Sequence, residues 1–180
     1  MKYTRRNYQA GDFIRIRDFL KKTYRTMPAQ YNWLIDRWNF CRYFEQPIYG
    51  TFASWPDSVG IWVNENGAIV SVANSEGENR GEVFFQFGID HYPVDLLEEM
   101  IAFSEKSMCA DEGGMKGVYI RLNEDQHGII EKLKIRNYTL DDGKETTCCM
   151  DLTTSHVTKL PDGFWIVDAN KASLDERVVA

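Results

Sequence analysis

The chain has 180 residues, of which 43% are hydrophobic and 27% charged. These fractions are those of ordinary globular domains and exclude a wholly disordered chain. The length suits one domain, or one domain with a short extension. No apolar run approaches the roughly 18 residues that a membrane span needs, and charged residues interrupt the N-terminal segment, which argues against a signal peptide. We therefore expect a cytoplasmic protein without a membrane partner.

The net charge of −6 argues against nucleic acid as a partner. The charge is unevenly distributed, because residues 1–25 hold eight Lys/Arg against two Asp, a net of +6, and the remainder carries −12. This basic segment could hold an anion, although a solvated helix face is the simpler interpretation. The three histidines are widely spaced and the four cysteines form no CxxC pair, so we expect no metal site and reduced thiols.

The predicted elements alternate between strand and helix patterns of apolar residues. Strands are expected at 3–8, 59–63, 68–73, 82–87, 118–122, 138–141 and 145–152. Helices are expected between Asp12, which can cap the first, and Pro28; around the stripe Leu34, Trp38 and Cys41; at 94–111; and at 124–136.

Three of these strands follow one another through short polar turns, which predicts an antiparallel meander over 59–87. The next strand follows a helix, and this strand–helix–strand unit at 82–122 needs a crossover. The element order is therefore β-α-α-β-β-β-α-β-α-β-β. It predicts an α/β (α+β) fold class with a mixed, mainly antiparallel sheet flanked by helices.

This order of elements resembles that of the GNAT superfamily of N-acetyltransferases. The segment GEVFFQFGIDH (81–91) is similar to the family's central strand and its exit. The segment YIRLNEDQHGIIEKLKIRNYTLDD (119–142) is similar to the strand, helix and strand that carry a Leu-Tyr-x-x-x-Gly-Phe signature, whose last two positions read Asn137 and Tyr138 here. The resemblance covers residues 3–152.

The resemblance implies acetyl transfer from acetyl-CoA to a small-molecule amine. In the family, backbone groups of the splayed central strand hold the pantetheine arm like an extra strand, and Phe87, Gly88 and Ile89 occupy that place here. A glycine-rich loop at the next helix start holds the pyrophosphate with free amides. A general base accepts the amine proton, and a tyrosine on the last helix protonates the thiolate.

The sequence departs from this pattern at two places. The segment 88–95 is short, has one glycine and no arginine, contains Pro93, and places acidic side chains where a phosphate needs a positive helix end. The tyrosine position reads Leu133, which has no proton to give. Glu82, expected to be exposed near its strand's start, and Tyr138 are the remaining catalytic candidates.

Aromatic residues crowd the second helical region and its exit. Trp33, Tyr49 and Trp55, with Gln86 on the central strand, are the candidates for a substrate pocket, because the resemblance places this region beside the acceptor cleft. The alternative interpretation is that these aromatic side chains pack in the core.

The last residues suggest a further unit. Residues 153–163 are interpreted as a linker, and 164–180 resemble the first strand and helix of a second GNAT domain. A helix that docks on its own domain or on a homodimer mate is the alternative.

Our leading hypothesis is a GNAT-like lobe, degenerate in acetyl-CoA binding, that supports an acetyltransferase domain. The alternatives are an active acetyltransferase that binds acetyl-CoA through 82–89, and a small-molecule or protein binding module that uses the aromatic cluster.

Overall fold

The computed structural model describes residues 2–26, 31–45, 55–77, 81–89, 92–112, 115–145 and 160–163. The chain divides into two compact units, residues 1–139 and 140–180. All the helices and strands described below belong to the first unit. The proposed stub at 164–180 and most of the proposed linker lie outside the described residues. No helix among the described residues is long and apolar enough to cross a membrane.

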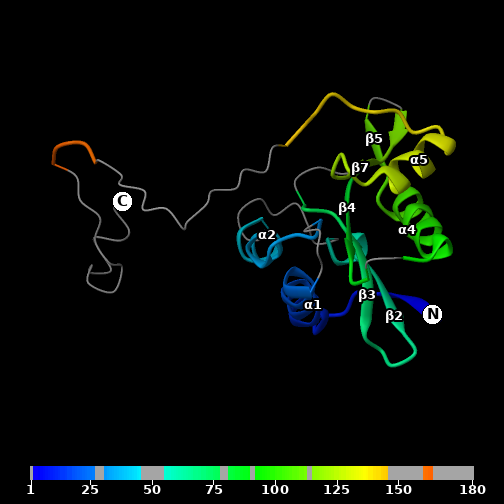
Figure 1. Cartoon of the computed structure of the whole chain (residues 1–180), viewed down its shortest axis with the longest axis horizontal. Helices are drawn as coiled ribbons and strands as arrows, with labels where there is room; N and C mark the ends of the chain where they lie inside the picture. The colour runs from blue at the N-terminus through cyan, green and yellow to red at the C-terminus, as the bar shows by residue number, and fades with distance from the viewer. Residues whose placement is uncertain are drawn as a thin grey trace. The chain divides into compact units, whose positions relative to one another are not determined.

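A five-stranded mixed sheet forms the centre of the first unit (Figure 1). Its strand order is β1 (Tyr3–Asn7), β2 (Gly60–Asn64), β3 (Ile69–Asn74), β4 (Glu82–Phe87) and β7 (Tyr119–Arg121). Neighbouring strands pair antiparallel except β4 and β7, which pair parallel. The predicted fold class, an α+β fold with a mixed and mainly antiparallel sheet flanked by helices, is confirmed.

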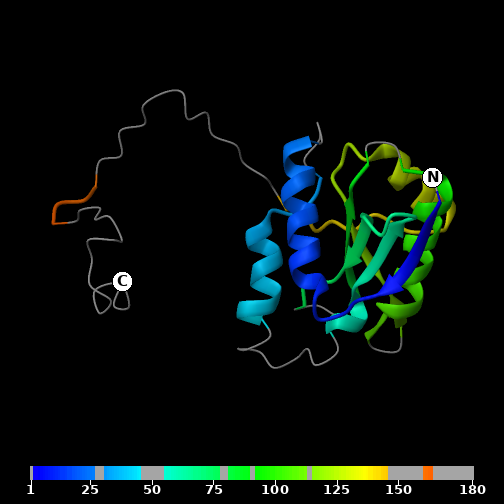
Figure 2. The same cartoon turned by 90° about the horizontal axis from the view of Figure 1, so that it is seen from below.

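Helices cover both faces of this sheet, as Figure 2 shows. On one face lie α1 (Asp12–Thr26) and α2 (Ile35–Phe40), which continues as a π-helical turn, η1 (Cys41–Glu45). On the other face lie α4 (Val94–Ser107) and α5 (His127–Ile135). A 3-10 turn, η2 (Trp55–Ser58), precedes β2. The sheet therefore separates two hydrophobic cores.

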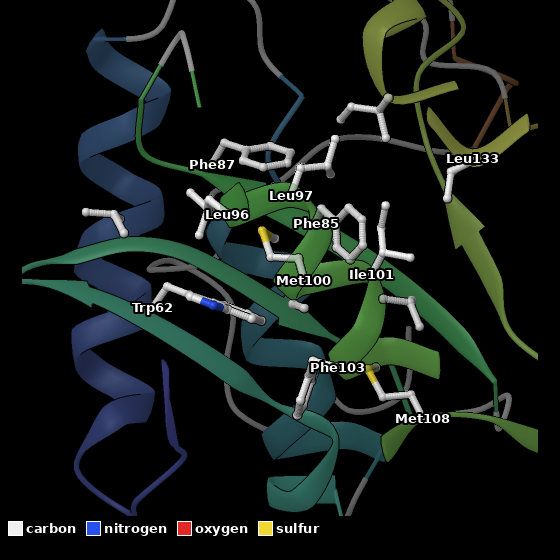
Figure 3. Close-up of a cluster of buried hydrophobic side chains, with 14 residues drawn as sticks. Trp62, Phe85, Phe87, Leu96, Leu97, Met100, Ile101, Phe103, Met108 and Leu133 are labelled. Atoms are coloured by element: carbon white, nitrogen blue, oxygen red, sulfur yellow. The ribbon is translucent and has the colours of Figure 1, made fainter. Parts of the chain in front are cut away.

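Strand β4 contributes to both cores, because alternate side chains of a strand point to opposite faces. All six of its residues are buried. Val83, Phe85 and Phe87 belong to the core beneath α4 and α5 (Figure 3), whereas Phe84 belongs to the core beneath α1 and α2. Strand β4 therefore packs against helices on both faces of the sheet.

A buried carboxylate fixes the start of α1. Asp12 is 2% exposed and binds the Arg6 guanidinium through two contacts of 2.6 Å. It also accepts the Gln9 N–H at 2.8 Å and pairs with Arg15 at 3.2 Å. The hydrogen bonds from Arg6 are the main reason that the pKa of Asp12 lies below its ordinary value, while burial opposes them.

We expect Asp12→Asn to destabilise the fold by about 3 kcal/mol at neutral pH, because Arg6 then loses its charged partner. Because the pKa of Asp12 is depressed, the ion pair stabilises the fold fully at pH values above the ordinary carboxyl pKa of about 4. The stabilisation is lost as the pH falls through the lower pKa that Asp12 has in the folded state. Urea unfolding of both proteins between neutral and acidic pH measures this. A difference in unfolding free energy that does not shrink below pH ~4 would contradict the assignment.

The predicted end of α4 is wrong. The helix ends at Ser107 rather than at Asp111, and a two-stranded hairpin of β5 (Ala110–Glu112) and β6 (Met115–Gly117) follows it. The chain turns here because Met108 still packs into the core while Ala110 comes close to Gly81. A Cβ on Gly81, whose φ is +89°, would lie 3.0 Å from the Cβ of Ala110.

The strand predicted at 138–141 is also wrong, because the end of α5 uses this segment differently. Asn137 has a φ of +64°, and its N–H bonds to the carbonyl of Lys134. The N–H of Tyr138 bonds to the carbonyl of Leu133 at 3.0 Å. These two bonds form a Schellman cap, in which Asn or Gly takes the left-handed position. Residues 146–152 of the last predicted strand lie outside the described residues.

Candidate functional site at the end of strand β4

Strands β4 and β7 pair over only three positions before they diverge. The paired residues end at Phe84 and Arg121, although β4 continues to Phe87. Strand β3 still pairs with β4 as far as Phe87, and the Gly88 N–H bonds to the Val70 carbonyl at 2.9 Å. The second half of β4 therefore keeps its neighbour on one edge and loses β7 on the other.

The side chain of Asn32 binds the backbone that this divergence leaves without a strand partner. Successive residues of a strand direct their backbone N–H and C=O groups to opposite edges of the strand. Since the Gly88 N–H is directed to β3, the N–H and carbonyl of Phe87 are directed away from β3. The Asn32 Oδ1 accepts the Phe87 N–H at 2.8 Å, and the Asn32 Nδ2 donates to the Phe87 carbonyl at 2.6 Å. The same Nδ2 donates to Thr23 Oγ1 at 3.0 Å. One amide side chain thus replaces the peptide group of a neighbouring strand.

The residues on either side of Asn32 extend this contact, and we call Tyr31–Trp33 the bridging segment. The Tyr31 hydroxyl donates to Asp125 Oδ2 at 3.0 Å, in the loop before α5, and this bond raises the pKa of Tyr31. The Trp33 N–H donates to Gln86 Oε1 at 2.8 Å. The bridging segment therefore joins the connection between α1 and α2 to both β4 and the loop that follows β7.

Aromatic packing encloses the end of β4 on the α4 side. The rings of Phe87 and Tyr92 stack with centroids 4.5 Å apart and planes 21° apart. Phe87 is 3% exposed, and Ile89 packs partly buried against the same core. Burial raises the pKa of Tyr92, and the neighbouring Tyr31 adds to this rise.

Gly88 faces helix α1. A Cβ at this position would lie 2.6 Å from the Phe19 ring and 3.1 Å from the Val70 carbonyl oxygen. The space that the glycine leaves is therefore filled by the protein's own phenyl ring.

The predicted pocket residues come together in the core under α2. Gln86 is 1% exposed, accepts the Trp33 N–H and donates to Asn74 Oδ1 at 3.3 Å. Trp33 is 7% exposed, and its ring lies 4.8 Å from that of Phe84. Trp55 is 3% exposed and donates its indole N–H to the Ser75 carbonyl at 3.0 Å. Tyr49 lies outside the described residues.

Glu82, one of the two catalytic candidates, lies at the opposite end of β4. The expectation that it is exposed is wrong, because the side chain is buried and its carboxylate binds Arg121 Nε at 2.6 Å. This ion pair joins the first part of β4 to β7. Glu82 and the Phe87–Gly88 end of the strand therefore do not meet.

Tyr138, the other candidate, belongs to the contact between α5 and α4. Its hydroxyl donates to Glu105 Oε1 at 3.1 Å, and burial together with this carboxylate raises its pKa. Leu133, at the position of the family's tyrosine, is buried in the same core (Figure 3). Glu105 lies in the second half of α4, whereas Phe87 and Gly88 precede that helix.

Acidic side chains occupy the first turns of α4. Asp95 accepts the Leu96 N–H at 3.1 Å. Burial raises the pKa of Tyr3, and a hydrogen bond with Asp95 adds a smaller rise. Glu98 pairs with Lys132 at 2.9 Å. Glu99 accepts the indole N–H of Trp62 at 3.0 Å. Asp90 and His91, in the preceding loop, lie outside the described residues.

A shallow, open depression of about 490 Å³ lies between α2 and the residues that follow β3. Asp36, Arg37, Phe40 and Glu76 line it. Arg37 binds both carboxylate oxygens of Glu76 at 2.6 Å, and its guanidinium lies over the rings of Trp33 and Phe84. Within the described parts of the chain, no group of three His, Cys, Asp or Glu side chains is placed to hold a metal ion.

Comparison with models of protein families and with curated proteins finds no match for this chain.

Proposed function

We propose that this chain is a GNAT-like lobe that does not hold acetyl-CoA and supports a catalytic acetyltransferase domain rather than transferring acetyl groups itself. The observation that carries the proposal is the Asn32 amide bound to both backbone groups of Phe87. The resemblance to the family implies a pantetheine site between two parallel strands that diverge. In this chain a side chain already occupies the edge of the strand.

The competition would be direct, because a pantetheine arm offers amide groups of the same kind as Asn32. To reach Phe87, the ligand would have to break both hydrogen bonds of the Asn32 side chain with that residue. Each such bond contributes about 1 kcal/mol when it is exchanged for water, and more when it leaves a buried group unpaired. An internal amide also loses no translational freedom on binding, whereas the ligand does.

The start of α4 supports the proposal for a second reason. A pyrophosphate needs free N–H groups and positive potential at a helix N-terminus. Pro93, the residue before α4, has no N–H, and Asp95 places a carboxylate in the first turn. Asp95 also accepts the Leu96 N–H. This end of the helix is therefore suited to repel an anion.

The candidate acids and bases support it for a third reason. The Glu82 carboxylate is engaged by Arg121, the Tyr138 hydroxyl is engaged by Glu105, and Leu133 cannot donate a proton. A catalytic base or acid needs to reach the reacting atoms. The proposal accordingly gives the chemistry to a partner, either a second GNAT-like domain or a homodimer mate. It places the chain in the cytoplasm, where thiols stay reduced.

Thermal unfolding with and without millimolar acetyl-CoA tests the proposal. We expect no change in the unfolding midpoint. Binding at a hundred times the dissociation constant would add about 2.7 kcal/mol, which raises the midpoint by several degrees in a domain of this size. The same concentration of ATP serves as the control for unspecific phosphate effects. A rise with acetyl-CoA alone would overturn the proposal and favour an active acetyltransferase that uses β4.

A further inference from the structure

The outer face of α1 carries four cations that make no ion pair or side-chain hydrogen bond with any described residue. They are Arg17, Lys21, Lys22 and Arg25, and we call them the basic face. Lys21, Lys22 and Arg25 are exposed and Arg17 is half-buried, whereas Phe13, Ile16 and Leu20 on the core side of α1 are buried. Three of the four cations follow one another at four-residue spacing and form a line about 12 Å long.

Many cations elsewhere in the domain are paired, which sets this face apart. Arg6 and Arg15 bind Asp12, Arg37 binds Glu76, and Arg121 binds Glu82. On the outer side of α1 itself, Asp18 is the one acidic side chain among the described residues. The sequence that follows α1, residues 27–30, contains no Asp or Glu. On the outer side of α1, the basic face therefore has four cations against one acid.

Exposed apolar side chains flank the basic face. Ile14 is 44% exposed and Tyr24 is 47% exposed, both on α1. Leu34 and Ile35, at the start of α2, are 51% and 40% exposed. The hydrogen bond from Asn32 to Thr23 holds the end of α1 beside the segment that leads into α2. The surface thus combines a line of positive charge with apolar side chains.

We propose that the basic face docks an acidic segment of a partner protein, one that also presents apolar side chains to Ile14 and Tyr24. Charge complementarity favours a short segment over an extended polyanion. Helix α1 carries five Lys/Arg and two Asp, whereas the rest of residues 1–139 has a net charge of −5. A DNA duplex or an anionic bilayer extends far beyond 12 Å and would also face the acidic remainder of the domain. Salt screening restricts the attraction between the basic face and such a polyanion to about 8–10 Å.

This inference does not rest on the loss of cofactor binding, because the basic face lies on the outer side of α1 and not at the end of β4. A GNAT-like lobe that binds acetyl-CoA would carry the same surface. The two proposals therefore fail or succeed separately.

The test is fluorescence anisotropy of a labelled synthetic helical peptide that carries glutamates along one line and leucines beside it. We expect the full chain to bind it, and the affinity to fall as salt is added. The double variant Lys21→Glu, Arg25→Glu should weaken binding at least about tenfold, since two attractive charges become repulsive. The matched control is Lys106→Glu, Lys116→Glu, which makes the same charge change at two exposed lysines on α4 and β6. It should bind like the unchanged protein.

Three results would overturn the proposal. Equal weakening by both double variants would show that overall charge, not this face, attracts the peptide. No weakening by the α1 variant would place the binding elsewhere. Tighter binding of phosphatidylserine vesicles or duplex DNA than of the peptide, lost in the α1 variant, would assign the face to a different partner. All the replaced side chains are exposed, so the thermal midpoints of both variants should match that of the unchanged protein.

Discussion

Replacing Asn32 by alanine is expected to lower the free energy of unfolding by about 3 kcal/mol. The change removes two hydrogen bonds to Phe87 and one to Thr23. It leaves the Phe87 N–H and carbonyl without their partner at a site that is mostly buried. Urea unfolding monitored by tryptophan fluorescence measures the loss.

Two further variants separate this role from a general effect of losing an asparagine. Asn66→Ala, at an exposed turn residue, should change stability by less than about 0.5 kcal/mol. Asn32→Asp keeps an acceptor for the Phe87 N–H but turns a carboxylate oxygen toward the Phe87 carbonyl, so it should destabilise at least as much as alanine does. If Asn32→Ala and Asn66→Ala proved equally mild, the bridging segment would not be held as the distances indicate.

Gly88→Ala is expected to destabilise the domain by about 2 kcal/mol, because the new methyl group enters occupied space. Its Cβ would lie 2.6 Å from the Phe19 ring and 3.1 Å from the Val70 carbonyl oxygen, which belongs to the sheet backbone. The measurement is again urea unfolding, at unchanged solvent conditions. The result bears on function as well. If Gly88 served only to let a cofactor approach the backbone, Gly88→Ala would leave the stability of the cofactor-free protein unchanged.

The control is a glycine with open space around it. Gly128, in the first turn of α5, has no atom within 4 Å of a built Cβ, so Gly128→Ala should be neutral or stabilise the helix by up to about 1 kcal/mol. Combining Gly88→Ala with Phe19→Ala should cost less than the sum of the two single changes, because the smaller side chain makes room for the methyl group. Additive costs would contradict the packing assigned to Gly88.

The sheet could be predicted where the apolar pattern changes period. Alternation at 59–63 and the turn residues around Gly67 locate β2 and β3, and the buried run at 82–87 locates β4. The end of α4 could not be read in the same way, because Ala110 and Asp111 fit a helix as well as a short strand. Ala110 and Asp111 form a strand by pairing with Gly117 and Lys116 across a hairpin. Gly81, which leaves room for Ala110, lies far along the chain.

The end of α5 shows a different limit. Tyrosine favours strands, which is why the sequence predicts one at Tyr138. In the structure the Tyr138 N–H instead donates to the carbonyl of Leu133 and caps the helix. The signal in the sequence was the residue type at position 137, since Asn and Gly are the residues that take the positive φ at which helices end in this way.

The candidate site could be located from the sequence but not completed. The pattern placed Gln86, Phe87 and Gly88 together at the end of one strand, and the structure keeps them there. Asn32, which binds that strand end, and Tyr31, which binds the loop before α5, lie in a short connection between two helices with no periodic signal. Asn32 is 55 residues from Phe87, and Tyr31 is 94 residues from Asp125. Only the fold brings such positions together.

The opposite directions of the Phe87 and Gly88 amides have a consequence for the motions of the domain. The Gly88 N–H is bound within the ladder to β3, so its hydrogen exchanges with solvent only when the sheet itself opens. The Phe87 N–H is bound by one side chain, so its hydrogen exchanges when the bridging segment alone swings away. Two consecutive amides therefore record two separate events. The ratio of their exchange rates, each corrected for its intrinsic rate, gives the difference between the free energy of opening the sheet and that of releasing the bridging segment.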